Sequence, residues 1–502
     1  MTTPVQQCST PPSTSAAASA IPGHTETDAA TSAARRAVRP GYSRWLEHVG
    51  AAGGCHQPIR LAGHLHTINP TTGEVLSSRP TATMPDGVIY VPCGDRRATV
   101  CPACAETYRA DTYHLVRAGL VGGKGIPESV ATHPCVFVTL TAPSFGPVHT
   151  HVVDRRTGKI KPCRVRRRLE LCPHGRPKSC SQRHAADARC VGRPLCPDCY
   201  DYPAHVVFNA WAGELWRRTT ITANRLLRPL GQQHGVQLRL SFAKVAEYQH
   251  RGLVHFHALI RLDAIDSTDP DALVVPPAAL NAAHLDQAIT RAAATTVVQT
   301  PPHPERPDGW TLTWGRELDI RPVQHGGELT DTAVAGYLAK YATKSTETTG
   351  HISRRITTDT IDIFATATHT GRIIRTCWQL GHRPDHQHPA DWKQTYGRLR
   401  RWAHMLGFGG HFATKSRRYS TTRAALKQTR RAWRQRRAHI RPAGHNTADH
   451  TDEETTLVIG ALTFAGIGYR TIGDHWLALT AAAKAREQRQ TAKEERMTRL
   501  VS

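Results

Sequence analysis

The sequence predicts an α+β protein in which helices flank an antiparallel sheet. Arg251-Gly252 reads as a turn between the segments 241–248 and 253–261, which predicts an antiparallel β-hairpin. The segment 204–230 repeats apolar residues at helical spacing. A further segment, 335–344, is rich in helix formers. Strands and helices of these kinds in one region favour a mixed core.

Composition narrows the classes of partner. The 502 residues include 65 Lys and Arg against 40 Asp and Glu, a formal charge of +25, which favours nucleic acid over a membrane as partner. No apolar run reaches about eighteen residues, and the N-terminus lacks the layout of a signal peptide. We therefore expect a cytoplasmic protein with no membrane partner. In a reducing compartment, its 13 cysteines indicate metal sites more than disulfides.

The composition also divides the chain, whose length leaves room for several domains. The predicted regions are a disordered Ser-, Thr-, Ala- and Pro-rich tail at 1–40, a zinc-binding module at 41–130, a central core at 131–350, a basic region at 351–441, and a C-terminal helical segment and tail at 442–502. A Cys-rich insertion at 150–203 and an Ala/Pro-rich insertion at 263–310, with one helix near its middle, interrupt the core. Residues 456–479 are apolar enough to pack as a small helical unit.

The predicted hairpin carries a candidate metal site. Because side chains alternate along a strand, His255 and His257 point to one face while Phe256 points to the apolar other face. Glu247, near the end of the preceding strand, can supply a third ligand. Two histidines and a carboxylate suit a divalent ion used as a Lewis acid. The alternative of two structural histidines stays open on this triplet alone, because the chain has 30 histidines.

A pair of tyrosines is a candidate nucleophile. Tyr337 and Tyr341 are four residues apart and share one face of a helix, and Lys340 and Lys344 form a second pair beside them. A phenol with a pKa near ~10 is a weak nucleophile at neutral pH, so it needs nearby cations or a polarised phosphorus. By itself, a tyrosine pair at this spacing more often serves packing than catalysis.

The first of two Cys-Pro-x-Cys motifs predicts a structural zinc site. Cys101 and Cys104 form a compact pair of thiolates, the kind that opens half of a tetrahedral site. Cys93 and Cys55 are the candidates that complete it, and His56 is an alternative to Cys55. Unligated buried thiols are the alternative reading.

The second Cys-Pro-x-Cys motif lies in the Cys-rich insertion and predicts a second structural zinc. Cys196 and Cys199 form the pair, and we assign Cys172 and Cys180 as their partners. Three other residues compete for those two places: His174, His184 and Cys190. Neither motif shows an empty coordination position or a general base, so both sites are predicted to be structural.

A basic stretch follows the core. Residues 393–441 contain 15 Lys and Arg and no Asp or Glu, whereas a solvated surface helix normally carries both signs. One-signed charge predicts contact with phosphates, and interleaved aromatics can add base stacking. The aromatics are Trp402, Phe408, Phe412, Tyr419 and Trp433. The candidate DNA-binding residues are Arg398, Arg400, Arg401, Lys415, Arg417 and Arg418.

These motifs together resemble the HUH endonucleases (His, hydrophobic, His), and specifically rolling-circle replication initiators. Tyr337-Leu-Ala-Lys340-Tyr341 fits the two-tyrosine form of their third motif, and Phe137-Val-Thr139-Leu140-Thr141 fits their first motif. The chain is similar in particular to RepSA-like plasmid initiators of actinobacteria, from about residue 40 to about residue 480. Further matching segments are 195–202, 216–220 and 405–416.

The resemblance implies an HUH-type antiparallel sheet faced by the tyrosine helix, with zinc-binding modules and a basic helical C-terminal region around it. It also implies metal-dependent nicking and joining of single-stranded or hairpin origin DNA. His255, His257 and Glu247 would hold Mg²⁺ or Mn²⁺, which polarises the scissile phosphate. Tyr341 would attack and form a 5′-phosphotyrosine with a free 3′-hydroxyl, and Tyr337 would act in the terminating transfer.

Other readings remain open at this point. No Gly-x4-Gly-Lys-Ser/Thr loop is present, so unwinding is expected to fall to a host helicase. A relaxase or transposase of the same superfamily is one alternative, although relaxases usually carry three histidines and an N-terminal tyrosine, the reverse of the order here. A non-enzymatic zinc-ribbon DNA-binding regulator is the other, in which the His and Tyr pairs would be structural.

Overall fold

The computed structural model describes residues 26–69, 71–154, 156–323, 331–344, 349, 354–439 and 457–501. These residues form two compact units: the first unit contains residues 111–426, and the second unit joins the chain before residue 111 to the chain after residue 426. Both contain antiparallel sheets with flanking helices, so the predicted α+β class is confirmed. The unit boundaries differ from the predicted regions, because segments distant in sequence share one unit.

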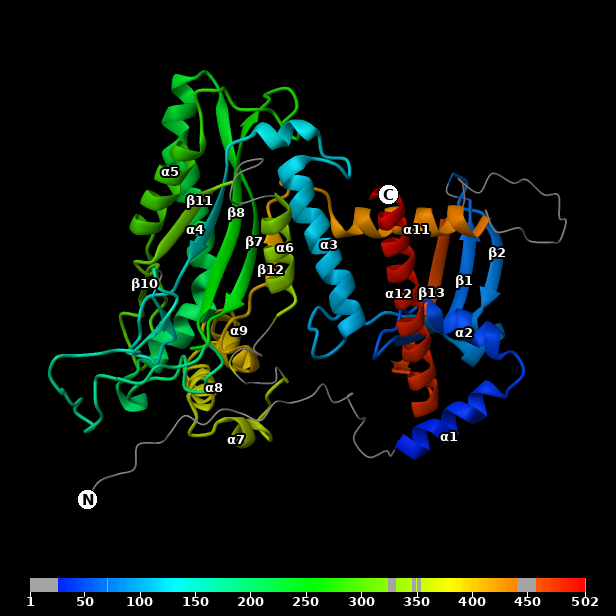
Figure 1. Cartoon of the computed structure of the whole chain (residues 1–502), viewed down its shortest axis with the longest axis horizontal. Coiled ribbons are helices and arrows are strands. Elements are labelled where there is room, and N and C mark those ends of the chain that lie inside the picture. The colour runs from blue at the N-terminus through cyan, green and yellow to red at the C-terminus, as the bar shows by residue number, and fades with distance from the viewer. Residues whose placement is uncertain are drawn as a thin grey trace. The chain divides into compact units, whose positions relative to one another are not determined.

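The first unit is built on a five-stranded antiparallel sheet in the order β11-β4-β8-β7-β12 (Figure 1). Its strands are β4 (Cys135–Leu140), β7 (Gln237–Tyr248), β8 (Val254–Ile265), β11 (Leu318–Pro322) and β12 (Ala413–Lys415). β7 and β8 form the predicted hairpin, in which Glu247 lies directly opposite His255. Gly252 in the turn has φ +79°, a backbone conformation that favours glycine. This sheet positions the candidate site.

One face of the sheet packs on two long helices. These are α4 (Tyr202–Gln233) and α5 (Ala282–Thr295), and both match helices predicted from the sequence. Asp201 accepts a hydrogen bond from the backbone N–H of Ala204 and so caps α4. The Phe256 ring is fully buried against Trp216 of α4, with ring centroids 6.1 Å apart. Burial of each such side chain stabilises the sheet by about 1.5–3 kcal/mol.

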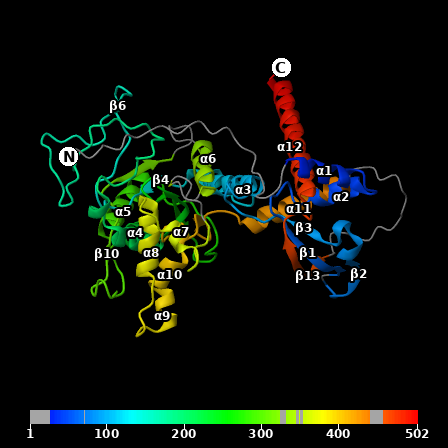
Figure 2. The same ribbon diagram turned by 90° about the horizontal axis from the view of Figure 1, so that it is seen from below.

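The opposite face of the sheet carries the candidate site and is covered by α6 (Asp331–Ala342), which confirms the predicted tyrosine helix. Ala335, Leu338 and Ala339 of α6 are fully buried. Figure 2 shows α6 separated from α4 and α5 by the sheet. Small residues on the inner side of α6 allow it to approach β7 closely.

A buried ionic cluster lies farther along the same face. Arg261 and Asp263 of β8 are fully buried and form a bidentate ion pair, with N–O distances of 2.6 Å and 3.1 Å. Arg261 also donates to the carbonyl oxygens of Gly119, at 2.5 Å, and Tyr419, at 3.2 Å. His133 contacts the other side of the pair, 2.8 Å from Asp263. The cluster therefore ties three distant segments to β8.

The part of the predicted basic region from residue 354 to residue 426 belongs to the first unit and is not a unit of its own. The helices here are α7 (Ile361–Phe364), α8 (His369–Leu380), α9 (Pro389–Gln394) and α10 (Gly397–Arg401). Phe408, Phe412 and Tyr419 are only 2%, 5% and 0% exposed. The prediction that these aromatics stack on bases is therefore corrected: they are core residues, and their hydrophobic area is already used in packing.

The Cys-rich insertion has little regular structure. Between β4 and α4 the described chain forms one two-stranded ribbon, β5 (Val152–Val153) and β6 (Ile160–Lys161). A second small ribbon, β9 (Val298–Gln299) and β10 (Thr311–Leu312), follows α5. Hydrogen bonds within so short a ribbon cannot hold the roughly fifty residues of the Cys-rich insertion in one conformation.

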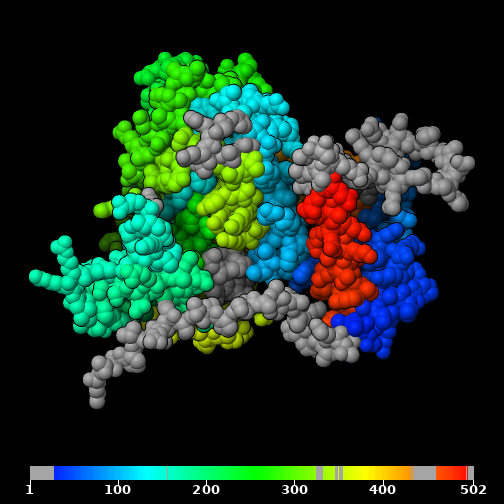
Figure 3. Space-filling view, viewed as in Figure 1, coloured from blue at the N-terminus to red at the C-terminus, as the bar shows by residue number. Residues whose placement is uncertain are grey.

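The second unit is a smaller sheet with helices. Strands β13 (Leu457–Ile467), β1 (Ile59–Ile68) and β2 (Val75–Pro80) lie in that order, and β3 (Ile89–Val91) also pairs with β1. The helices are α1 (Glu26–Ala37), α2 (Tyr42–Gly50) and α12 (Ile472–Val501). Figure 3 shows α12, in red, against the blue N-terminal segment.

Two predictions about this unit are wrong. The segment from residue 457 is a strand, β13, rather than part of a helical unit, because it pairs antiparallel with β1 along its length. Residues 26–37, predicted as disordered tail, form α1. Arg36 of α1 is fixed by Asp474, at 2.6 Å, and by Asp86, at 3.0 Å. The remainder of the predicted tail, residues 1–25, lies outside the described residues.

The basic helix α11 (Arg423–His439) confirms that part of the stretch after the core is helical. Leu426 of α11 is buried. The side chain of Trp433, one of the aromatics expected to stack on bases, lies outside the described residues. No helix in the described part of the chain has the length and apolar character needed to cross a membrane.

Asp263→Ala should lower the free energy of unfolding by about 3–5 kcal/mol, because it leaves the buried Arg261 charge without its carboxylate. Burial raises the pKa of Asp263, but hydrogen bonds from His133 and Arg261 outweigh burial and lower this pKa to about 2. Since the unfolded value is near 3.8, this stabilisation is present above about pH 4 and is lost as the pH falls toward 2. Denaturant unfolding between pH 2 and pH 7 measures both effects.

The matched control is Asp271→Ala, which breaks an ion pair with Arg418 at a carboxylate that is 62% exposed. Its unfolding curve should stay close to that of the wild type. Equal losses in the free energy of unfolding for the two substitutions would show that the buried cluster contributes no more to stability than an exposed ion pair.

Candidate functional site

The structure brings Glu247, His255 and His257 together on one face of the β7–β8 hairpin. The Nε2 atoms of the two histidines are 2.8 Å apart, and Glu247 Oε2 lies 3.4 Å from His255 and 3.3 Å from His257. Adjacent ligands of an octahedral ion with bonds of about 2.1 Å are about 3.0 Å apart. The three ligand atoms therefore fit one divalent ion, with its other coordination positions left for water or phosphate.

The first-motif strand orients this site. Thr139 of β4 pairs with His257 of β8, and its hydroxyl is 3.0 Å from His257 Nδ1. With an ion in the site, Nδ1–H could donate to this hydroxyl and leave the lone pair of Nε2 for the ion. Phe137 stacks on the His257 ring with an interplanar angle of 9°. Both residues lay within a sequence motif, but the sequence did not indicate that they touch His257.

Local electrostatics favour the ligand forms of these side chains. Burial raises the pKa of Glu247, but hydrogen bonds from His255 and His257 outweigh it and lower this pKa to about 2. Burial lowers the pKa of His257. Glu247 is therefore an anion and His257 is neutral at pH 7, the protonation states that bind a cation.

The tyrosines of α6 face the same three residues. The Tyr337 hydroxyl is 3.3 Å from His257 Nε2, and the Tyr341 ring centroid is 5.9 Å from that of His257. The two tyrosine rings are 4.5 Å apart. Burial raises the pKa of both phenols, and the negative charge of Glu247 raises both further. Both are therefore protonated at neutral pH unless positive charge is added beside them.

Two lysines supply part of that positive charge. Lys344 Nζ lies 4.4 Å from the centroid of the Tyr341 ring and 3.8 Å from Glu247 Oε1, and Lys340 Nζ lies 5.9 Å from the same ring. Helix α6 ends at Ala342, so Lys344 is not on the helix as predicted. Its long side chain still reaches Tyr341 from the segment that follows.

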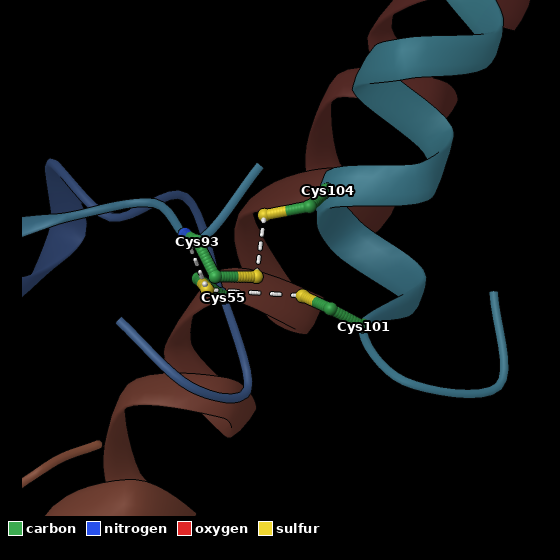
Figure 4. Close-up of side chains that lie close together, drawn as sticks. All are labelled: Cys55, Cys93, Cys101 and Cys104. Carbon is green, nitrogen blue, oxygen red and sulfur yellow. Dashed lines mark hydrogen bonds between the residues drawn. The ribbon is translucent and has the colours of Figure 1, made fainter. Parts of the chain in front are cut away.

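The first predicted zinc ligands form one cluster in the second unit, the N-terminal cluster. Figure 4 shows Cys101 and Cys104 at the start of α3 (Pro102–Val121), with Cys55 and Cys93 on separate loops facing them. The Sγ–Sγ distances are 3.7 Å for Cys55–Cys101 and 3.6 Å for Cys93–Cys104. The edge of a tetrahedral site with Zn–S bonds of about 2.3 Å is about 3.8 Å. The cluster has the size of a Cys₄ zinc site.

Hydrogen bonds support thiolates in the N-terminal cluster. The backbone N–H of His56 donates to Cys101 Sγ at 3.4 Å, so His56 supports the cluster through its backbone. The backbone N–H of Cys93 donates to Cys55 Sγ at 3.2 Å. The hydrogen bond from Cys55 is the largest cause that lowers the pKa of Cys101, to about 4, and the same bond raises the pKa of Cys55, so one thiolate is favoured in this pair before a metal binds. Such donors are typical of the surroundings of metal-bound thiolates.

The second predicted ligand set is corrected at one position. Cys172, Cys196 and Cys199 lie together as predicted, but His174 completes their set, which we call the Cys₃His cluster. His174 Nδ1 is 3.2 Å from Cys199 Sγ and 3.7 Å from Cys196 Sγ. Cys180 lies elsewhere, because its backbone N–H and carbonyl pair with those of Arg164.

A third group of ligands lies in the same insertion and was not predicted. We call it the Cys₂His₂ cluster, and its members are His149, Cys163, Cys180 and His184. His184 is a sequence-based candidate for the second site, whereas His149 and Cys163 carry no sequence signal because neither belongs to a Cys-x-x-Cys motif. Cys190, another such candidate, contacts His184 Nδ1 at 3.3 Å from outside the cluster.

Several predicted DNA-binding cations have partners within the first unit. Arg398 lies over the Trp211 ring at 3.7 Å, and burial lowers its pKa to about 10. Lys415 donates to three backbone carbonyls, and Arg418 pairs with Asp271 at 2.6 Å. Arg400 lies over Trp378 at 4.0 Å and Arg401 over Trp402 at 5.4 Å. Arg417 and Arg401 are the two exposed members of the set.

Cys104→Ser should remove one zinc ion per chain and destabilise the second unit, since a structural zinc contributes directly to folding. Metal analysis of the purified chain, together with limited proteolysis, measures both effects. Cys377→Ser is the control, because Cys377 is a buried thiol outside all the clusters. A Cys104→Ser protein with unchanged zinc content would rule out the N-terminal cluster as a metal site.

Comparison with known proteins identifies the family. Residues 41–483 match the family model described as "Replication initiator protein, pSAM2" (RepSA). A replication initiator protein of Streptomyces ambofaciens is 42% identical over 475 residues, which cover 92% of this chain and 94% of that protein. No solved structure matches significantly. The chain therefore belongs to the RepSA family of replication initiator proteins.

Proposed function

We propose that this plasmid replication initiator starts rolling-circle replication by nicking one strand of its origin DNA and later rejoining it. The observation that carries the proposal is the convergence of Glu247, His255 and His257 with Tyr337 and Tyr341 on one sheet face. A phenol beside a divalent-metal site is an arrangement suited to phosphoryl transfer. Because the chain belongs to a family of replication initiators, origin DNA is the expected substrate.

The metal ligands prepare the scissile phosphate. Mg²⁺ or Mn²⁺, when bound, supplies Lewis-acid polarisation of a phosphate oxygen. Glu247 contributes the anionic ligand, and Thr139 holds the His257 ring so that Nε2 faces the phosphate-binding side. The covering helix α6 limits access of water to this face, which strengthens electrostatic interactions there.

Tyr341 is the proposed first nucleophile. Its oxygen attacks phosphorus as the bond to the 3′ oxygen breaks, so the phenol loses its proton and the departing 3′ oxygen gains one. Lys344 and Lys340 lie beside the Tyr341 ring and offset the charge that develops on the phenolate. The 5′-phosphotyrosine retains the energy of the cut bond, so a 3′-hydroxyl can later displace Tyr341 without ATP. Tyr337 then performs the second, terminating transfer.

Phosphate contacts are proposed for the cations that remain exposed. Arg401 and Arg417 are exposed, as is Lys427 of α11, and the sequence of α11 contains no carboxylate. In the Cys-rich insertion, Arg164–Arg168 add a second exposed basic segment. Together these cations would hold the single-stranded or hairpin origin by counterion release. A host helicase is the proposed source of unwinding, since the sequence contains no phosphate-binding loop of the helicase type.

His257→Ala should reduce nicking of an origin oligonucleotide by more than about 100-fold. Loss of a residue that only supports a metal ligand costs up to about 100-fold, and loss of the ligand itself should cost more. DNA affinity should stay near that of the wild type, because His257 is only 5% exposed and contributes no cation. The control is His388→Ala, at a histidine whose side chain is 72% exposed. Nicking by the His257→Ala protein at the wild-type rate in chelator would contradict the metal assignment. Origin binding without nicking by the wild type would favour a non-enzymatic regulator.

Tyr341→Phe should eliminate the covalent DNA adduct on a single-stranded origin oligonucleotide, because it removes only the attacking oxygen. Tyr337→Phe should still form the adduct but leave multimeric products in a replication assay. Denaturing gels and peptide mapping of the adduct identify the tyrosine used. The opposite pattern would exchange the two roles, and an adduct in the double variant would exclude both tyrosines.

A further inference from the structure

The Cys₂His₂ cluster has the chemistry of a further metal site. Its four candidate ligand atoms, two thiolate sulfurs and two imidazole nitrogens, lie within 4.8 Å of one another. Cys163, the innermost thiol, is buried, as is His184. Two thiolates with two imidazoles form a donor set that zinc prefers in structural sites.

The distances within the cluster fit a tetrahedral ion. His149 Nδ1 is 3.2 Å from His184 Nε2, and Cys180 Sγ is 3.4 Å from the same Nε2 atom. Cys163 Sγ is 4.0 Å from His149 Nδ1. With Zn–N bonds of about 2.05 Å and Zn–S bonds of about 2.3 Å, the tetrahedral edges are about 3.3 Å between nitrogens and about 3.6 Å between nitrogen and sulfur. The arrangement needs only small shifts around an ion.

The surrounding backbone holds the ligands in this arrangement. The backbone N–H of Thr150 donates to Cys163 Sγ at 3.2 Å, as expected around a thiolate. Arg164 and Cys180 exchange two backbone hydrogen bonds of 2.8 Å, which bring the Cys163 and Cys180 segments side by side. His151 contacts the carbonyl of His184 at 2.7 Å and fixes the segment that carries the fourth ligand.

The order of ligands along the chain links this cluster to the Cys₃His cluster. The four ligand pairs alternate between the two clusters: His149 and Cys163, then Cys172 and His174, then Cys180 and His184, then Cys196 and Cys199. Each cluster therefore closes a loop that contains a ligand pair of the other. We propose that the Cys₂His₂ cluster is a third zinc site, and that two zinc ions cross-brace residues 149–199. The proposal is independent of the nicking activity.

Cross-bracing explains how this insertion is ordered with so little secondary structure. An ion bound in one cluster shortens the free chain between the ligand pairs of the other cluster. Each ion therefore lowers the entropy cost of binding the other ion. The two sites should therefore bind with positive cooperativity.

The braced segment supports the candidate active site through the β7–β8 turn. Gly192 has φ +84°, and a Cβ atom there would lie 2.4 Å from the backbone of His250 in that turn. Asp198, between two Cys₃His ligands, pairs with Arg372 of α8 at 2.7 Å. The insertion therefore contacts the hairpin that carries Glu247 and His255, and its metal ions fix that contact.

The test is metal analysis of the full-length purified chain by mass spectrometry, with zinc supplied during expression. We expect three zinc ions for the wild type and for Cys377→Ala. Cys180→Ala should lose one zinc ion. In this variant a chelator should remove zinc from the Cys₃His cluster at least about threefold faster than in the wild type. Threefold is the factor expected when the loop that the cluster closes doubles in free length. Cys104→Ala should also lose one zinc, but its other ions should leave at the wild-type rate.

A conservative variant guards against a folding failure. Cys180→His keeps a zinc ligand at that position, so it should retain three ions even if Cys180→Ala does not fold. Two zinc ions in the wild type, or three in Cys180→Ala, would overturn the third site. Loss of one ion from Cys180→Ala with unchanged release from the Cys₃His cluster would overturn the cross-brace.

Discussion

The pairing register of β7 with β8 is the constraint on which the candidate site depends. Glu247 lies opposite His255, and Val245 opposite His257, so one face of the hairpin presents both imidazoles and the carboxylate. A shift of one residue would turn these side chains into the core and expose Phe256. The register is fixed from both faces: Phe256 is buried on Trp216, while Arg261 and Asp263 are locked into their own cluster on the site face. A buried ion pair adds little net stability, but a one-residue slip of β8 would turn both charges toward the apolar face, away from His133 and Gly119.

The sheet also brings the other parts of the site to this hairpin. β4 pairs with β8, so Thr139 reaches His257, and α6 packs on β7, so Tyr337 and Tyr341 face the same point. The candidate metal ligands and the proposed nucleophiles thus come from strands and a helix rather than from loops. Rigid placement matters for phosphoryl transfer because in-line attack tolerates little displacement of the reacting oxygen.

Local patterns allowed the elements that carry the candidate site to be predicted. Alternation specified the hairpin, apolar spacing specified α4, and i,i+4 spacing placed both tyrosines on one side of α6. Long-range pairing could not be predicted this way. β13 is a strand because it pairs with β1, which is far away in sequence. Cys180 lies beside Cys163 because its backbone pairs with that of Arg164. A motif with short spacing reveals only the half of a zinc site that lies within it.

The number of positive charges in a segment predicted DNA-contacting residues less well than the motifs predicted the candidate site, for a physical reason. Fifteen cations without a carboxylate predict phosphate contact, but a guanidinium or ammonium group can instead contact an aromatic ring or backbone carbonyls of the same protein. Arg398 on Trp211 and Lys415 among three carbonyls do so, whereas Arg417 and the exposed arginines of the insertion remain open to solvent. The arginines of the insertion are attached to a segment that metal ions, rather than a hydrophobic core, would hold in shape. If so, metal content should affect the binding of origin DNA as well as the proposed nicking, because the same braced segment carries these cations and contacts the turn beside Glu247.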